Sequence, residues 1–241
     1  MNYRFYPAED KSKAVVFLHG WGASMASFEF FYRAIKGISV LAVDFAGFGE
    51  SPEPSRPYTV EDYADELNDL ISNLNIKKVI FVCHSFGGRV AIKYNYKYNS
   101  SVVGNIFIDI AGIKPRFNLL VWLKIRWYKF LKKLSKLNII KNVRLDKFGS
   151  SDYRVLSNVM KATFKNVISE DLSDEVKKIR AKTLIIWGRE DRDTKIYMAK
   201  KINRLVKGSI LVLISGDHFA YLDNRYRVLH EICNFIGEVY A

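Results

Sequence analysis

Six short runs of apolar residues recur along the chain, and they limit its fold more than any other feature of the sequence. The runs are rich in Val and Ile, and polar residues do not alternate within them. Runs of this kind are typical of strands that are buried on both faces of a sheet. They cover residues 14–18, 38–43, 79–82, 102–108, 183–187 and 210–214.

Helical patterns lie between these runs. One begins at Thr59, whose hydroxyl can cap a helix together with Asp62, and continues with Tyr63, Leu67 and Leu74 at helical spacing. Alternating strands and helices predict an α/β fold, a mainly parallel sheet flanked by helices. With 241 residues, 49% of them hydrophobic, the chain is long enough for one domain with a large core.

The alternation stops at Gly112 and resumes near Thr183, and the residues between them are helical in pattern. Because ligands bind at the carboxyl ends of strands in open α/β sheets, we expect residues 113–178 to form a helical cap over the site. This cap would be an insertion in a single domain of residues 1–241. The net charge of +13 is concentrated here, since residues 114–165 contain fourteen Lys and Arg and two acidic residues.

Within the expected cap, residues 119–137 form a basic amphipathic helix when they are wound at helical spacing. Two interpretations of this helix stay open. One is a lid whose apolar face lines an acyl pocket and whose basic face makes weak contact with an anionic membrane surface or with a negatively charged substrate. The other is a cap helix with an ordinary solvated lysine face. We expect no nucleic-acid partner, because no stacking platform or binding motif accompanies the charge.

The sequence also bears on location. The first thirteen residues contain no apolar run, which argues against a signal peptide. The most apolar segment, 119–137, is interrupted by six Lys and Arg, so we expect no membrane span. The only cysteines are Cys83 and Cys233, a number that suits a reducing compartment. We therefore expect a cytoplasmic protein.

A candidate nucleophile follows the run at 79–82, where the sequence reads Cys83-His84-Ser85-Phe86-Gly87-Gly88 and then becomes helical. A serine between strand and helix, with glycine two residues later, fits the nucleophile elbow, a strained turn that exposes the hydroxyl. The elbow pattern has Gly two residues before the serine, where this chain has Cys83. By itself the pattern is also compatible with an ordinary turn.

Several motifs together resemble those of the α/β-hydrolase family, and they span nearly the whole chain in the family's order. They are His19-Gly20-Trp21-Gly22, the loop from Asp44 to Ser51, the elbow at Ser85, Trp187-Gly188-Arg189-Glu190-Asp191 and Gly216-Asp217-His218-Phe219. The resemblance implies a serine hydrolase that uses neither a cofactor nor a metal and acts on a small-molecule acyl substrate.

Serine is a poor nucleophile unless a histidine accepts its proton and an acid orients that histidine. His218 fits this role, because it lies on a loop after a strand and the order Ser85, Asp191, His218 is the order of this fold. The resemblance places the acid three residues after the glycine of the Trp-Gly pair, which gives Asp191. The alternative acids are Asp109, Asp193 and Asp217.

Backbone amides would complete the site. The amide of Phe86 directly follows the nucleophile, and the resemblance assigns the second oxyanion-hole donor to the amide of Trp21. We therefore expect a serine hydrolase for a carboxylic ester or a related acyl substrate. Two alternatives remain: a carbon–carbon bond hydrolase, which typically has Asn where this chain has His84, and a catalytically silent member that binds a ligand or a membrane.

Overall fold

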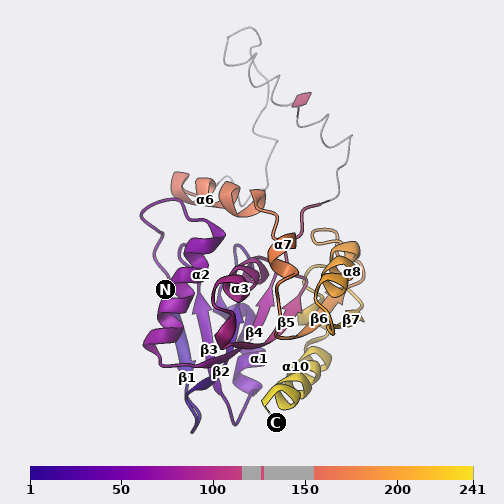
Figure 1. The fold of residues 1–241 in the computed structure, drawn as a ribbon. Helices are drawn as coiled ribbons and strands as arrows, with labels where there is room; N and C mark the ends of the chain where they lie inside the picture. Colours follow the sequence, from indigo (N-terminus) through magenta and orange to yellow (C-terminus); the bar gives the residue numbers. More distant parts are fainter. Residues whose placement is uncertain (116–125, 128–154, 241) are drawn as a thin grey trace. The chain divides into compact units, whose positions relative to one another are not determined.

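The computed structural model describes residues 1–115, 126–127 and 155–240. The chain divides into two compact units, one formed by residues 1–114 and 158–241 and the other by residues 115–157. The sheet and all helices named below belong to the first unit (Figure 1). The basic helix expected at 119–137 lies outside the described residues except for Arg126 and Trp127, and the extent of the cap stays a prediction.

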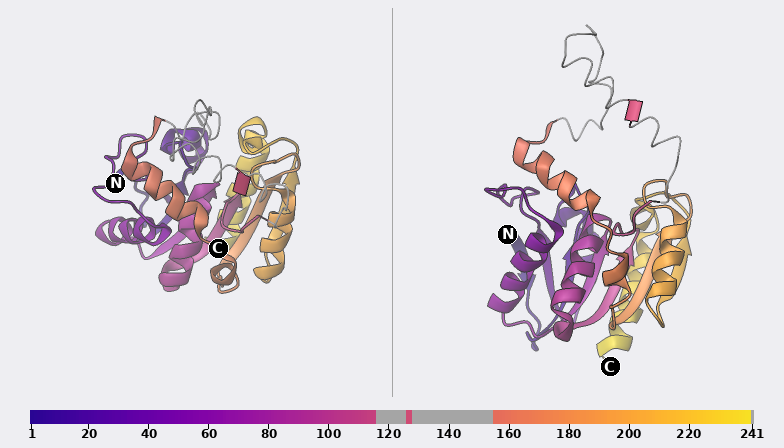
Figure 2. Two further views of the ribbon diagram at one scale, coloured as in Figure 1. Left: turned by 90° about the horizontal axis from the view of Figure 1, so that it is seen from above. Right: turned by 45° about the horizontal axis from the view of Figure 1, so that its top comes forward.

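A sheet of seven strands forms the centre of the first unit, between layers of helices (Figure 2). Its strand order is β1-β3-β2-β4-β5-β6-β7. Strands β2 to β7 run parallel, which confirms the prediction of an α/β fold with a mainly parallel sheet. The strands are β1 (Asn2–Tyr6), β2 (Lys13–Leu18), β3 (Ser39–Asp44), β4 (Lys78–His84), β5 (Val102–Ile108), β6 (Lys182–Gly188) and β7 (Ile210–Ile214).

Strand β1 is an addition to the predicted set. It pairs antiparallel with β3 at the edge of the sheet, and its residues are exposed or half-buried. An edge strand with one solvated face does not need a continuous apolar run, so the pattern that identified the other strands could not detect it.

Helices cover both faces of this sheet. They are α1 (Glu29–Ala34), α2 (Val60–Asn73), α3 (Phe86–Lys97), α6 (Asn158–Ser169), α7 (Ser173–Val176), α8 (Ile196–Leu205), α9 (Ala220–Asp223) and α10 (Arg225–Tyr240). Phe17 of β2 packs with Phe28 and with α1 and α10 on one face, whereas Phe81 of β4 contacts Tyr94 of α3 on the other. Helix α2 begins with the predicted capping box of Thr59 and Asp62.

The parallel arrangement positions the candidate site. Because β2, β4, β5, β6 and β7 run in one direction, the loops after them meet at a single edge of the sheet. Trp21, Ser85, Asp109, Asp191 and His218 follow these five strands in turn. In the part of the chain that the structure describes, no helix is both long and apolar enough to cross a bilayer.

Candidate active site

Ser85 occupies a tight turn between β4 and α3. Its backbone has φ of 48° and ψ of −111°, a left-handed conformation that non-glycine residues adopt at a cost of about 1–3 kcal/mol. The turn needs glycine at position 87, where a Cβ would lie 2.2 Å from the carbonyl oxygen of Leu18. The strained turn and the close approach of α3 to β2 are the features that the elbow pattern predicts.

Hydrogen bonds hold the turn in place. The Ser85 amide donates to the Ile108 carbonyl over 3.3 Å, and the Ser85 carbonyl accepts from the amides of Gly88 and Ala111 at 3.1 and 2.9 Å. Cys83, which replaces the usual glycine, is fully buried, and its thiol donates to the Ile106 carbonyl. Burial raises the pKa of the Cys83 thiol well above its ordinary value, so this side chain is not a competing nucleophile.

The structure brings His218 into contact with Asp191. The two atoms that meet are His218 Nδ1 and Asp191 Oδ2, 2.8 Å apart. Asp191 also accepts hydrogen bonds from the Thr194 hydroxyl at 2.6 Å and from the amides of Thr194 and Asp193 at 2.9 and 2.7 Å. The histidine is thereby held with Nδ1 toward the carboxylate, which leaves Nε2 for the substrate side.

These contacts also set the charge of Asp191. Burial acts to raise its pKa, but the hydrogen bonds from His218 and Thr194 outweigh that effect and the pKa lies below its ordinary value. The carboxylate is therefore ionised at neutral pH and can stabilise a positively charged His218.

The other candidate acids lie in different environments. Asp109 is fully buried, and its Oδ1 accepts from the Gly188 amide at 2.8 Å instead of contacting His218. Burial raises the pKa of Asp109 to about 8, so this group is largely protonated at neutral pH. Asp217 Oδ1 accepts from the Phe219 amide. Asp193 is exposed.

The remaining histidines are structural in their contacts. His84 Nε2 donates to the His218 carbonyl at 2.8 Å, and its ring lies 4.7 Å from the ring of His218. His19 Nε2 accepts from the Phe45 amide at 3.1 Å. Burial lowers the pKa of His84 to about 3 and that of His19 to about 4, so both are neutral at neutral pH. His230 lies exposed on α10.

Ser85 and His218 line the same cavity, which has a volume of about 420 Å³. Its walls are mostly aromatic and aliphatic, with Arg89 and Asp193 as the charged residues. The lining residues are Trp21, Ser85, Phe86, Arg89, Ala111, Phe164, Val167, Ile168, Asp193 and His218. The Ser85 hydroxyl makes no hydrogen bond to His218 in this structure, and such bonds commonly tighten only when substrate is bound.

The expected oxyanion-hole residues lie beside this cavity. Phe86 is the first residue of α3, so its amide has no acceptor within the helix. Among the described residues, the amide of Trp21 likewise donates to no other backbone or side-chain group. The Trp21 ring packs on Phe48, Phe86 and Phe164 at centroid distances of 4.8, 5.4 and 5.0 Å, which makes it part of the apolar wall.

One cluster among the described residues has the spacing of a metal site. Asp191, Asp193 and His218 each place a ligand atom within 4.8 Å of the others. Asp191 and His218 already hydrogen-bond directly, and a metal would have to replace that bond. The pair therefore fits proton transfer better than metal binding.

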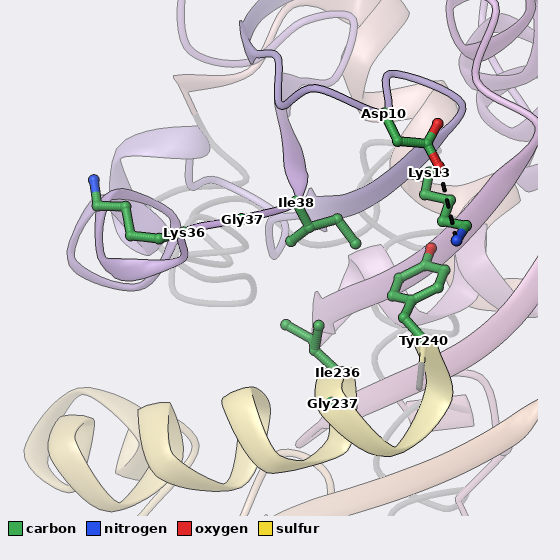
Figure 3. Close-up of a pocket in the computed structure, with 8 residues that line it drawn as sticks. All are labelled: Asp10, Lys13, Lys36, Gly37, Ile38, Ile236, Gly237 and Tyr240. Carbon is green, nitrogen blue, oxygen red and sulfur yellow. Dashed lines mark ion pairs between the residues drawn. The ribbon is translucent and has the colours of Figure 1, made fainter.

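A second hollow, of about 410 Å³, lies between α10 and the start of β2 (Figure 3). Because β2 and β4 are parallel and Ser85 follows the end of β4, this hollow lies at the opposite end of the strands from Ser85. Asp10 and Lys13 form an ion pair across 3.7 Å there, and the Tyr240 hydroxyl donates to the Ala14 carbonyl. The described residues that line this hollow include no serine, cysteine or histidine. It offers nothing comparable to the cavity at Ser85.

Comparison with known proteins shows the family of this chain. A sequence model of the alpha/beta hydrolase family matches residues 15–231. The chain belongs to this family. This α/β hydrolase is 26% identical over 254 residues to the AB hydrolase superfamily protein YisY of Bacillus subtilis, an alignment covering 92% of this chain and 91% of that protein.

Solved structures share the fold of this hydrolase. An esterase from Exiguobacterium antarcticum superimposes with a TM-score of 0.74 and 22% identity, over 98% of this chain and 94% of that one. A meta-cleavage product hydrolase from Pseudomonas fluorescens gives a TM-score of 0.74 and 20% identity, over 98% of this chain and 94% of that one. The structural neighbours therefore include an esterase and a meta-cleavage product hydrolase.

Two residues of the site were not foreseen from the sequence. Thr194 supports Asp191 with both its hydroxyl and its amide, and its place three residues after the expected acid was the only available signal. Arg89 lines the cavity with Ser85, although it falls in an expected helix where a surface arginine would be ordinary.

Proposed function

We propose that this α/β hydrolase is a serine hydrolase that acts on a carboxylic ester or a related acyl substrate. The observation that carries the proposal is the shared cavity: a serine on a strained strand-to-helix turn and a histidine paired with a buried carboxylate line the same space. Ser85, His218 and Asp191 are the proposed catalytic residues.

In the proposed mechanism, Ser85 Oγ attacks the acyl carbonyl while His218 Nε2 takes the hydroxyl proton. The positive charge that forms on His218 is stabilised by Asp191, whose low pKa keeps it ionised. Collapse of the tetrahedral intermediate breaks the ester bond, and His218 returns the proton to the leaving alcohol. Water, deprotonated by His218, then hydrolyses the acyl-enzyme and releases Ser85.

Two backbone amides would stabilise the negative oxygen of the tetrahedral intermediate. The amides of Trp21 and Phe86 are the proposed donors, and the amino end of α3 adds a favourable electrostatic potential. Losing one donor in such a site typically costs about 3–4 kcal/mol of transition-state stabilisation. The aromatic wall of Trp21 and Phe164 would accommodate an apolar part of the substrate.

The first test is hydrolysis of 4-nitrophenyl esters from acetyl to palmitoyl by the wild type, Ser85→Ala and Ser72→Ala. Ser72 is an exposed serine of α2 and serves as the matched control. We expect turnover by the wild type and by Ser72→Ala, and its loss in Ser85→Ala. Labelling by a fluorophosphonate should likewise depend on Ser85.

The alternatives give different outcomes in the same experiment. Labelling of Ser85 without ester turnover would favour a carbon–carbon bond hydrolase, an activity class represented among the structural neighbours by the meta-cleavage product hydrolase. Absence of both labelling and turnover would favour a catalytically silent member, and would contradict the proposal.

A further inference from the structure

Arg89 is a buried cation beside the proposed nucleophile. It lies in the first turn of α3, four residues after Ser85, and both residues line the 420 Å³ cavity. Only 6% of its surface is exposed. Burying a guanidinium is costly unless hydrogen bonds and a negative charge compensate for its lost hydration, so the contacts of this side chain are informative.

The described residues compensate Arg89 only in part. One guanidinium nitrogen, Nη1, donates to the Glu170 carbonyl at 2.9 Å, just beyond the end of α6. No carboxylate of the described residues lies within 4.0 Å of it. A guanidinium has five N–H donors, and this one has a single hydrogen-bonded neighbour in the described part of the chain.

Glu170 and Asp171 lie close enough for their charges to act on Arg89, and Asp193 lines its cavity, but each of these acids has other partners or is exposed. The Glu170 carboxylate pairs with Lys93 across 2.5 Å, and the Asp171 carboxylate accepts from the amide and hydroxyl of Ser173. Asp193 is exposed and lies beside His218, within the cluster that it forms with Asp191. The guanidinium therefore retains donors for a ligand in the cavity.

We propose that Arg89 binds a carboxylate group of the substrate, so that this hydrolase acts on acyl substrates carrying a carboxylate near the reacting carbonyl. The proposal rests on the proposed function of Ser85. A planar guanidinium can donate two parallel hydrogen bonds to a carboxylate, and such charge-assisted pairs are stronger than neutral hydrogen bonds. Arg89 is then a specificity-determining residue.

The spacing limits the size of this substrate. Ser85 is the N-cap residue of α3 and Arg89 lies one turn further along the helix, and the two residues line one cavity of about 420 Å³. A carboxylate that reaches Arg89 while its carbonyl lies at Ser85 would be separated from that carbonyl by a few methylene groups. The aliphatic side chains of Val167 and Ile168 line the same cavity and could contact such a linker.

The competing explanation is that Arg89 only fastens the end of α6 to α3 through its bond to Glu170. Basic side chains near a helix carboxyl end commonly bind the last carbonyls. A purely structural role predicts that replacing Arg89 affects charged and neutral substrates equally. A specificity role predicts that the ratio of kcat/KM for charged substrates to kcat/KM for neutral substrates changes.

The test compares charged and neutral esters in two pairs. One pair carries the carboxylate in the acyl half, 4-nitrophenyl hydrogen adipate against 4-nitrophenyl hexanoate. The other carries it in the alcohol half, 4-acetoxybenzoate against 4-methylphenyl acetate. We expect the wild type to favour the charged ester in at least one pair. In that pair, Arg89→Met should lower the charged-to-neutral ratio of kcat/KM at least about tenfold.

Two further variants control for folding and charge. Arg89→Lys keeps the charge without the planar fork and should retain part of the preference, which keeps the test usable if Arg89→Met folds poorly. Lys93→Met removes a buried cation from the same helix, one that pairs with Glu170 and Glu175 and does not line the cavity. Lys93→Met should leave the charged-to-neutral ratio of kcat/KM unchanged.

Several results would overturn the proposal. One is a charged-to-neutral ratio of kcat/KM of one or less for the wild type in both pairs of esters. Another is a loss of kcat/KM in Arg89→Met that is equal for charged and neutral esters. If the wild type neither turns over esters nor reacts with a fluorophosphonate, the proposed function fails separately. Calorimetric titration with adipate and hexanoate then tests Arg89 alone, and equal affinity of the wild type and Arg89→Met for adipate would refute the inference.

Discussion

The free energy of unfolding of Asp109→Asn, measured relative to that of the wild type, should increase as the pH rises. Asp109 is fully buried after β5, and only its Oδ1 has a hydrogen-bond donor, the Gly188 amide. The other oxygen, Oδ2, meets no partner among the described residues. Burial raises the pKa of this carboxyl to about 8, whereas an aspartate in an unfolded chain has a pKa of about 3.9.

The magnitude follows from proton linkage. Because the folded protein holds the Asp109 proton more tightly than the unfolded chain, this group stabilises the fold fully below about pH 4. That stability is lost as the pH rises toward 8. Between pH 5 and pH 8 the loss amounts to about 3–4 kcal/mol. Asn does not titrate, so Asp109→Asn removes this loss, while its amide adds a cost that does not depend on pH.

The assay is thermal unfolding of both proteins at several pH values from 5 to 8. For a chain of this size 1 kcal/mol corresponds to about 2–4 °C, so the melting temperature of Asp109→Asn relative to wild type should rise by about 10 °C over this range. Asp69→Asn removes an exposed carboxylate from α2 and controls for the change in net charge. If the melting temperatures of Asp109→Asn and wild type differ by the same amount at pH 5 and at pH 8, the reasoning is refuted.

Three more predictions test the site, the turn and the basic segment. Asp191→Asn should lower kcat/KM for nitrophenyl esters about 10³–10⁴-fold by disturbing the histidine tautomer, and Asp109→Asn less than about tenfold. The reverse order in a steady-state assay would move the acid role to Asp109. Gly87→Ala should melt far below wild type, because its Cβ would lie 2.2 Å from the Leu18 carbonyl oxygen, whereas Gly237→Ala on α10 meets nothing within 4 Å and should stabilise by about 0.5–1 kcal/mol. Equal melting temperatures of these two variants would contradict the packing argument. Binding to anionic vesicles should exceed binding to neutral ones and weaken with salt, because residues 114–165 contain fourteen Lys and Arg and two acids. Equal, salt-insensitive binding measured by co-sedimentation would exclude a membrane role for this segment.

The parallel strands and the capped helix at Thr59 could be predicted because each depends on a local pattern. A strand buried on both faces requires a run of apolar residues, and a capping box requires two side chains three positions apart. The edge strand β1 depends instead on pairing with β3, more than thirty residues away in the chain. The residues of β1 alone do not indicate that pairing.

The parts of the site that could be predicted are those set by the order of strands and helices along the chain. The positions of Ser85 and His218 after parallel strands follow from the alternation of elements, and their catalytic roles stay predictions. Arg89 could not be identified in advance, because its burial depends on α6 and on the connection to α7, which are about eighty residues away. A helix pattern alone cannot tell a solvated arginine from one that faces a cavity.

The choice between two buried carboxyls shows why residue type is not enough to assign an acid. Asp109 and Asp191 both follow neighbouring strands and are both buried. Asp191 receives hydrogen bonds from the His218 ring, the Thr194 hydroxyl and two amides, whereas Asp109 receives one from the Gly188 amide. Donors stabilise the ionised form and burial without donors favours the neutral form, so the two pKa values move in opposite directions. In the proposed mechanism a proton moves to His218, and only a carboxyl that is already charged can stabilise it there. The hydrogen-bond donors that surround Asp191 keep that carboxyl charged.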